Sequence, residues 1–443
     1  MSRNRNTSVV GPIDWTIVGI WIFFIVFGWM TIYSAAYDSA HPMPFDFAKE
    51  YGKQMMWIGI SVLLAIFTLY IEGDFFAKFA WVIYGFFVLL LALVLVVGKE
   101  VNGAKAWFGI GSFGIQPSEF SKIGVGLVLA KYIASIGGGQ LKSNRSRMVS
   151  AAIIGFPALL ILLQPDVGSL LTFVAFVFVM YREGLSGNVL IVGFAAILFG
   201  VLSIVSGAST ANIPFYGEQS GVWVLIIVIA VLMILTVLYT RSFIPPRNRR
   251  RMYLVVVGGA IAASAFSYSV SYIVDNILEK HHKERIYVML SLPVERKDAD
   301  YNAEMAKITV GMGGVFGKGW LDGPMTQNNY VPEQWTDFIF SAVAEEWGFL
   351  GSLILISTYV YLIIRLMVIA DRQRSEFSRV YGYCVACIFF MHFLINIGMV
   401  IGLAPIIGIP LPFFSYGGSS LMAFTLLLFI MVRLDSERWS VLK

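Results

Sequence analysis

The sequence predicts an all-α, polytopic integral membrane protein. Of its 443 residues, 58% are hydrophobic and 13% are charged, whereas a soluble domain is roughly 45–50% apolar and about 25% charged. The apolar residues gather in runs long enough to cross a bilayer, which takes about 20 residues of helix. Length alone suggests several globular domains, but these runs favour a single membrane domain over residues 1–443.

Twelve apolar runs are predicted to span the membrane. The first follows a polar N-terminus, which indicates a true span rather than a cleavable signal peptide. The fifth and sixth are short, and they predict either half-helices broken at residues 164–166 or tilted full spans. The predicted spans are 15–35, 54–71, 76–98, 118–136, 150–163, 168–182, 187–206, 221–240, 253–275, 347–369, 383–403 and 417–434.

Lys and Arg in the short loops predict the orientation, because they are enriched on the cytoplasmic side. The run RNRRR at 247–251 is the clearest inner loop. Both termini are therefore predicted on the cytoplasmic side of the membrane. The largest outer loop is then 276–346, which carries charges of both signs. Its Gly-rich stretch 311–319 predicts irregular backbone packed against the helices, since such backbone at membrane depth must be buried or line a wet cavity.

Several functions are disfavoured by what the sequence lacks. There is no Walker motif, HExxH or Rossmann fingerprint, which argues against a nucleotide-driven pump. The net charge of +5 lies in the short loops, so it does not indicate a nucleic acid partner. Cys384 and Cys387 lie one helical turn apart in an apolar run. They are interpreted as core residues, because a redox pair needs an exposed thiolate.

Four segments differ from ordinary membrane-span sequence. QPSEFSK at 116–122 places Pro117 and Glu119 in the first turn of a helix, where Pro and an acid are favourable, so a simple cap and a functional role are both open. QPD at 164–166 places a carboxylate at a helix break, with the same two interpretations. The others are VPEQWTDFIF at 331–340, followed by AEEWG, and GIPLPFFSYGGSS at 408–420. Their simplest interpretation is loop–helix packing at the outer rim.

In this order, and over nearly the whole chain, the four segments resemble the SEDS family of cell-wall polymerases (shape, elongation, division and sporulation proteins). The stretch 107–132 and the PEQ and EEWGF variants resemble the elongation-type members of the Bacteroidetes more than the division-type members. The family usually has ten spans. The extra pair is expected between about 207 and 252.

The resemblance implies the substrate and the reaction. Such proteins polymerise lipid II, a disaccharide-pentapeptide on undecaprenyl pyrophosphate, into glycan strands on the outer face of the membrane. The C4 hydroxyl of one sugar attacks the anomeric carbon of another with inversion, and the lipid pyrophosphate leaves. This displacement needs a general base and positive charge for the pyrophosphate. The implied partners are a class B penicillin-binding protein, which is a transpeptidase, and the elongation machinery.

The family places an essential Asp in the large outer loop. Aligned between Arg285 and the Tyr-Asn pair at 301–302, that position falls on Glu295, a departure that moves the carboxylate by about one bond length. Asp298 and Asp300 are alternatives if the alignment shifts. Without the resemblance, all three would be interpreted as solvated loop charges.

The remaining candidates fall into two groups. Cations, an aromatic and a carboxylate are expected to hold the substrate or line its cavity: Arg285, Lys307, Lys318, Lys105, Trp107, Glu119 and Lys122. For Trp107 an interface anchor is the simpler interpretation. Residues of the structural motifs are Gln164, Asp166, Glu333, Asp337, Pro410, Ser415 and Gly417, with Asp337 expected to open or cap the tenth span. No cofactor is predicted; a divalent cation would suit pyrophosphate departure, but no ligand set stands out.

Two other functions remain as alternatives to the polymerase. A flippase for lipid-linked precursors would share the substrate but needs a charged path to the inner face, whereas the ionisable residues are expected at the outer rim. A non-catalytic scaffold for the penicillin-binding protein is the third interpretation, which the departure at Glu295 favours.

Overall fold

The computed structural model describes residues 13–438 apart from short gaps. The gaps are 38–44, 102–103, 111–112, 138–140, 142, 214–216, 244, 277, 279–282, 284–286, 288–289, 291, 293–296 and 405. For residues 101, 110, 113, 210–213, 217–219, 297–300 and 303 only the backbone is described. The chain forms two compact units, Met1–Leu185 with Tyr301–Lys443, and Ser186–Asp300. The single membrane domain predicted from the sequence therefore stays a prediction.

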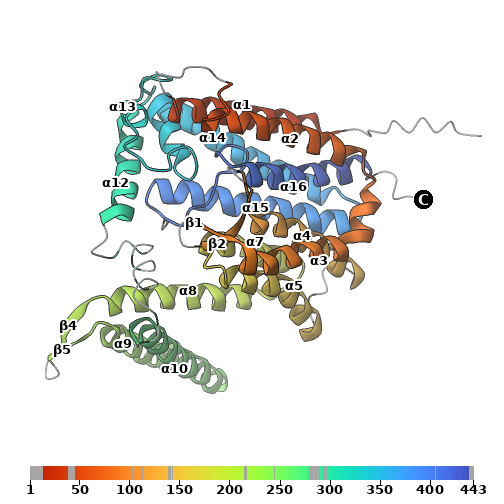
Figure 1. The fold of residues 1–443 in the computed structure, drawn as a ribbon. Helices are drawn as coiled ribbons and strands as arrows, with labels where there is room; N and C mark the ends of the chain where they lie inside the picture. Colours follow the sequence, from red (N-terminus) through yellow and green to blue (C-terminus); the bar gives the residue numbers. More distant parts are fainter. Residues whose placement is uncertain are drawn as a thin grey trace, which may run out of the picture. The chain divides into compact units, whose positions relative to one another are not determined.

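The first unit is a helical bundle (Figure 1). A three-stranded antiparallel sheet, β1 (Lys99–Val101), β2 (Ala104–Ile110) and β3 (Phe113–Ile115), joins α3 to α4. Its helices are α1 (Trp15–Ala35), α2 (Glu50–Tyr70), α3 (Gly73–Val97), α4 (Pro117–Ser135), α5 (Asn144–Leu162), α6 (Val167–Thr172), α7 (Ala175–Arg182), α13 (Pro324–Gln327), α14 (Ile339–Asp371), α15 (Glu376–Val400) and α16 (Gly418–Ser436). Helix α12 (Lys297–Met312) begins at the boundary between the units.

The second unit consists of three long helices and a hairpin. The elements are α8 (Gly187–Gly207), β4 (Thr210–Ile213), β5 (Gly217–Ser220), α9 (Val222–Phe243) and α10 (Pro246–Asn276). Only 6–11% of the most apolar part of each helix is buried. Such apolar, unburied helices are suited to a lipid environment. The helices of this second unit include the region between about 207 and 252, where the extra pair of spans was expected.

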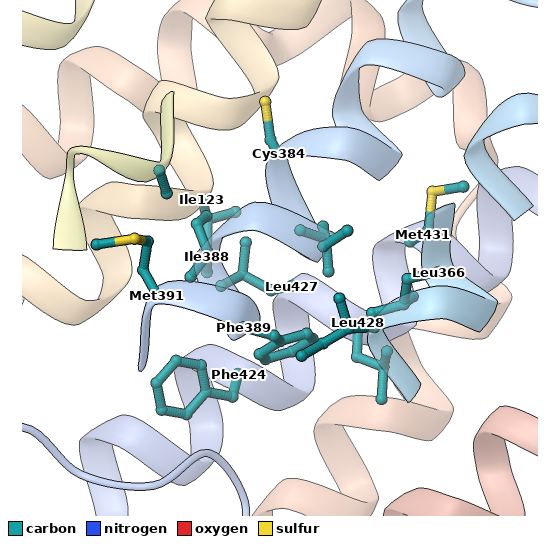
Figure 2. Close-up of a cluster of buried hydrophobic side chains, with 14 of the residues drawn as sticks. Ile123, Leu366, Cys384, Ile388, Phe389, Met391, Phe424, Leu427, Leu428 and Met431 are labelled. Atoms are coloured by element: carbon teal, nitrogen blue, oxygen red, sulfur yellow. The ribbon is translucent and has the colours of Figure 1, made fainter. Parts of the chain in front are cut away.

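The core of the first unit lies around α15 and α16. Their apolar windows are 78% and 89% buried, against 17–39% for α1, α2, α3, α5 and α14. Figure 2 shows Phe389 of α15 and Phe424, Leu427 and Leu428 of α16 packed together at this centre. Cys384 belongs to the same cluster and Cys387 is half-buried, which agrees with their interpretation as core residues.

Ten helices of the described chain are long and apolar enough to cross a membrane, which confirms a polytopic membrane protein. Of the twelve predicted spans, the other two are α4 and the α6–α7 pair. Helix α4 carries three charged side chains, Glu119, Lys122 and Lys131, and the apolar stretch Val167–Arg182 is short. The fifth span is a full helix of 19 residues, while the sixth is broken into two short helices.

Helix α14 begins eight residues before the predicted start of the tenth span, which was placed at 347. The buried carboxylates of Glu345 and Glu346 explain the difference. Glu345 accepts hydrogen bonds from the backbone N–H groups of Met325 and Thr326, at 2.9 and 2.8 Å. Glu346 accepts from the Ser34 hydroxyl and from the Leu321 N–H. Because neighbouring segments donate hydrogen bonds to both side chains, the helix continues through them.

The Gly-rich stretch packs against the helices as the sequence predicted. Helix α14 is kinked at Gly348, whose φ is +66°, a conformation that favours glycine. The backbone at 314–319 forms hydrogen bonds across this kink, with Phe349 N–H donating to Gly314 O and Lys318 N–H donating to Glu345 O. A Cβ at Gly317 or Gly348 would collide with the backbone of the facing segment. The glycines therefore permit the close approach.

Candidate functional site

The loop before α16, residues 406–417, is held by a hydrogen bond of its own and by bonds to three other segments. Its Leu411 N–H donates to Ser415 Oγ at 2.9 Å, and the Tyr359 hydroxyl donates to Pro412 O at 2.5 Å. The Tyr416 N–H donates to Trp335 O, and the Gly417 N–H donates to the side chain of Gln54 in α2. This loop, called the 406–417 loop below, is thus a fixed platform on which other groups converge.

A buried charged cluster lies beneath the platform. Lys122 Nζ donates to Glu119 Oε2 at 2.9 Å and lies 2.7 Å from His392 Nε2. His392 Nδ1 is 3.2 Å from Pro410 O. A carbonyl only accepts, so Nδ1 carries the proton and Nε2 accepts from Lys122. Glu119, Lys122 and His392 are all buried, so the Glu119–Lys122 pair lies in the interior of the bundle.

Asp166 caps α6 and connects it to α4. Its Oδ1 accepts from the Ser169 N–H at 3.0 Å, and its Oδ2 accepts from Gln116 Nε2 at 2.7 Å. The capping interpretation of QPD is therefore the one the structure shows. Two residues on, Gly168 lies under the platform: a Cβ there would be 3.0 Å from Ile407 O. Gln164 is also structural, since its side chain donates to Leu91 O at 3.1 Å.

The Asp337 side chain lies at the same platform without a partner among the described residues. Asn396 of α15 donates to Asp337 O and to Ile409 O, at 2.9 and 2.7 Å. The carboxylate itself lies near Gly408 and forms no hydrogen bond or ion pair within the described part of the chain. Burial, with the nearby Glu333 carboxylate, raises the pKa of Asp337 to about 7. The N-cap position of α14 is Phe338, so Asp337 precedes this helix without capping it.

The other predicted residues that the structure describes are spread over several elements. Trp107 is half-buried in β2, and its ring covers Gly114. Lys105 of β2 donates to Val96 O at 2.9 Å. Glu333 is exposed and accepts from the Thr336 hydroxyl. Lys307 lies exposed against Gly402, and Lys318 is exposed on the Gly-rich stretch.

The predicted catalytic residues are not placed. Glu295 and Arg285 lie outside the described residues. Asp298 and Asp300 fall in the first turn of α12, where only the backbone is described. Their roles stay predictions. Among the described residues, no group of three or more His, Cys, Asp or Glu side chains is arranged to hold a metal ion.

Sequence reasoning missed His392 and Asn396, which contact the platform from α15. Both lie in the predicted span 383–403, one helical turn apart in an otherwise apolar run. Polar side chains at this spacing on one face of a membrane helix are a signal for function or for a specific contact. That signal was available in the sequence.

A pH-dependent stability is expected from Asp337. The pKa of the Asp337 carboxyl is about 7 in the folded state, above the ordinary 3.8 of the unfolded chain. At a pH between these two values, the folded protein holds a proton that the unfolded chain has released. Stability therefore falls as pH rises from about 4 to 7. Asp337→Asn has no carboxyl group to ionise, so it does not lose stability in this way as the pH rises. Its midpoint of thermal unfolding is therefore expected to exceed that of the unchanged protein by more at pH 8 than at pH 5. Thermal unfolding in one detergent at both pH values measures this difference between the two midpoints.

The matched control is Asp322→Asn, because Asp322 is an exposed carboxylate in the same region. Its difference from the unchanged protein should be the same at both pH values. An equal, pH-independent gain in both variants would contradict the elevated pKa of Asp337.

These features define a class: a polytopic membrane protein with a buried ion-pair cluster and two carboxylates gathered under one fixed loop. A family model described as "cell cycle protein", for FtsW, RodA and SpoVE, matches residues 14–216 and 215–439. The chain belongs to this family, and the SEDS resemblance is confirmed.

The relatives agree with the elongation-type prediction, for which RodA is the family name. The chain is similar to peptidoglycan glycosyltransferase RodA of Treponema pallidum, at 30% identity over 93% of this chain and 95% of that protein. It is similar to peptidoglycan glycosyltransferase MrdB of Escherichia coli, at 29% identity over 93% and 90%. A chain of a solved structure described as "Structural coordination of polymerization and crosslinking by a peptidoglycan synthase complex" matches with a TM-score of 0.65, at 26% identity over 96% and 98%.

Proposed function

We propose that this chain is a peptidoglycan glycosyltransferase that polymerises lipid II into glycan strands during rod-shape elongation. The observation that carries the proposal is the convergence of Asp337 and the Glu119–Lys122–His392 cluster on the 406–417 loop. Asp166 caps the helix whose Gly168 lies against the same loop. All of these side chains except His392 come from the sequence segments that carry the family resemblance. Similarity to RodA and MrdB, both named peptidoglycan glycosyltransferases, supports it.

The chemistry requires a base and a cation on the same side of the bundle. Glu295 is proposed as the base that takes the proton of the attacking C4 hydroxyl, with Asp298 and Asp300 as alternatives. Asp337 is a further candidate, because a carboxylate with a pKa near 7 is suited to accept a proton at neutral pH. Arg285, Lys307 and Lys318 are proposed to stabilise the departing pyrophosphate. Trp107 and Lys105 are proposed to contact the sugar chain from the β2 hairpin.

The proposed setting is the bacterial cytoplasmic membrane with both termini inside. Residues 276–346 would then face outward as the catalytic loop of one membrane domain. The proposed partner is a class B penicillin-binding protein, which cross-links the new strands. Similarity to a chain of a peptidoglycan synthase complex that coordinates polymerisation and crosslinking supports such a partner.

Purified protein with its transpeptidase partner and labelled lipid II tests the proposal. Glycan polymer is expected, and it should persist with moenomycin, an inhibitor of the other polymerase family. Movement of lipid II across proteoliposome membranes without polymer would support a flippase instead. Neither polymer nor movement, with the partner present, would support a scaffold.

A further inference from the structure

Helices α9 and α10 run side by side (Figure 1), and the turn that joins them concentrates positive charge. Five arginines fall within residues 241–251, whereas the sequence has no acidic residue between Glu218 and Asp275. Glu218 lies in β5, before α9 begins, and Asp275 lies in the last turn of α10. Both acidic residues are therefore at the opposite end of the helix pair from the turn.

Most of these arginines present their guanidinium groups to the surroundings. Arg241, Arg247, Arg250 and Arg251 are exposed, and within the described part of the chain none of the four forms an ion pair or a hydrogen bond through its side chain. Arg249 differs, because it is half-buried and has a contact of its own. Four positive charges at this turn thus lack a counter-charge from the described residues.

Several arginines at the other predicted inner loops are paired instead. They contact carboxylates of the chain itself: Arg182 with Asp371, Arg379 with Glu183, Arg372 with Asp14 and Asp435, and Arg438 with Asp435. The preference of Lys and Arg for the cytoplasmic side explains why the turn is basic. It does not distinguish paired from unpaired arginines, so the exposed set at the α9–α10 turn is a separate feature that suits an external anion.

Three of the exposed arginines share one face of α10. Arg247, Arg250 and Arg251 stand at positions i, i+3 and i+4, which are neighbours on a helix surface. Guanidinium groups bind phosphate oxygens through paired, charge-assisted hydrogen bonds. The spacing therefore gives α10 a basic face that matches the chemistry of a phosphate group.

Beyond the arginines the same face becomes apolar. Leu254, Gly258 and Ile261 follow Arg251 at steps of three or four residues. Leu254 and Ile261 are 70% and 63% exposed, and a Cβ at Gly258 would meet no atom of another segment within 4 Å. A continuous strip thus runs from a basic end to an open apolar surface. A phosphate bound at the first part would place an attached hydrocarbon chain against the second.

The length of α10 places its basic end at the bilayer surface. The helix has 31 residues, about 46 Å at a rise of about 1.5 Å per residue, whereas the hydrocarbon core of a bilayer is about 30 Å thick. Its apolar sequence begins at Met252, so the six residues before it extend roughly 9 Å beyond the core. At the end of α9, Tyr239 and Phe243 are exposed and stacked, with ring centroids 4.8 Å apart. Aromatic side chains in such positions are typical of the headgroup layer.

We infer that the face of α10 formed by Arg247, Arg250, Arg251, Leu254 and Ile261, called the α10 strip below, binds an anionic phospholipid. The phosphodiester lies against the arginines and an acyl chain lies along the apolar part, in the leaflet that the sequence predicts to be the inner one. A soluble phosphate would use only the basic end. An acidic protein segment would match the charges but not the apolar surface that continues from them. The inference goes beyond the proposed function, because it needs neither lipid II nor polymerisation.

The test uses the intact chain, purified in detergent, and a photoreactive phosphatidylglycerol that carries the reactive group on its acyl chain. Mass spectrometry locates the labelled residues, and labelling is expected on the α10 strip between Leu254 and Ile261. Unlabelled phosphatidylglycerol should compete for this labelling, whereas phosphatidylcholine, inorganic phosphate and polyglutamate should not.

The variant that tests the strip combines Arg247→Gln, Arg250→Gln and Arg251→Gln. It should weaken the labelling about tenfold or more, since each basic side chain near an anionic lipid surface strengthens binding by a factor of about five. The three side chains are exposed, so the fold is expected to tolerate the change.

The matched control combines Lys131→Gln, Arg145→Gln and Arg147→Gln, which removes the same charge elsewhere on the predicted inner side. Lys131 and Arg147 donate to backbone carbonyls, and Arg145 is exposed. Labelling of the α10 strip should remain close to that of the unchanged protein, because none of these residues belongs to the strip.

Equal loss of labelling in the two triple variants would overturn the inference, because it would show a dependence on overall charge and not on the strip. Labelling confined to other helices, or equal competition by phosphatidylcholine, would overturn it as well. Competition by inorganic phosphate would indicate a site for free phosphate, and competition by polyglutamate a site for an acidic protein. Either of these two results contradicts a lipid site.

Discussion

Lys122→Met is expected to lower the free energy of unfolding by about 3–5 kcal/mol, because it leaves the buried carboxylate of Glu119 without its cation. Lys122 is fully buried and contacts Glu119, His392 and the ring of Phe424. Its loss also removes the donor to His392 Nε2, which holds the cluster against Pro410 O. The midpoint of thermal unfolding in detergent measures the loss, and polymerase activity should fall with it.

The double variant Glu119→Gln with Lys122→Met separates charge from packing. It removes both charges, so it should regain much of the stability lost in the single variant. Lys131→Met on the same helix is the matched control, because Lys131 is half-buried and donates to the backbone carbonyl of Lys78 rather than to a buried carboxylate. It should change stability by about 0.5 kcal/mol or less. A double variant no more stable than Lys122→Met would show that the charge pairing is not what holds the cluster.

Glu295→Gln is expected to reduce polymerisation by about 10²–10⁴-fold, the usual contribution of a general base. The amide keeps the size of the side chain and removes its basicity. Single-turnover assays with labelled lipid II measure the chemical step. Binding of lipid II should be unchanged, because the proposed role is in the reaction and not in holding the ground state.

Asp298→Asn, Asp300→Asn and Asp337→Asn form the comparison panel. If one of these loses the chemical step while Glu295→Gln retains it, the base moves to that residue and the alignment through Glu295 is wrong. Loss through Asp337 would place the base on the platform, beside Gly408. Loss in every variant together with loss of lipid II binding would instead indicate a structural role for the outer loop.

The helical membrane class followed from the sequence because its causes are local. A run of about 20 apolar residues spans a bilayer whatever its neighbours are, and α1, α8 and α9 begin and end close to the predicted limits. The start of α14 was missed because the buried Glu345 and Glu346 resemble a loop in sequence. Their satisfaction depends on residues 321–326, which lie about 20 positions away.

Part of the candidate site could also be predicted from the sequence, and part of it could not. Glu119 and Lys122 were expected to line one cavity, and in the structure they pair because residues three apart share a helix face. The family segments also predicted which parts of the chain carry the chemistry. Only the tertiary structure brought Lys122 to His392, 270 residues away, and the Asp337 carboxylate to Gly408. Those contacts depend on which helix faces pack together, and helical periodicity shows that a face is buried without showing what lies against it.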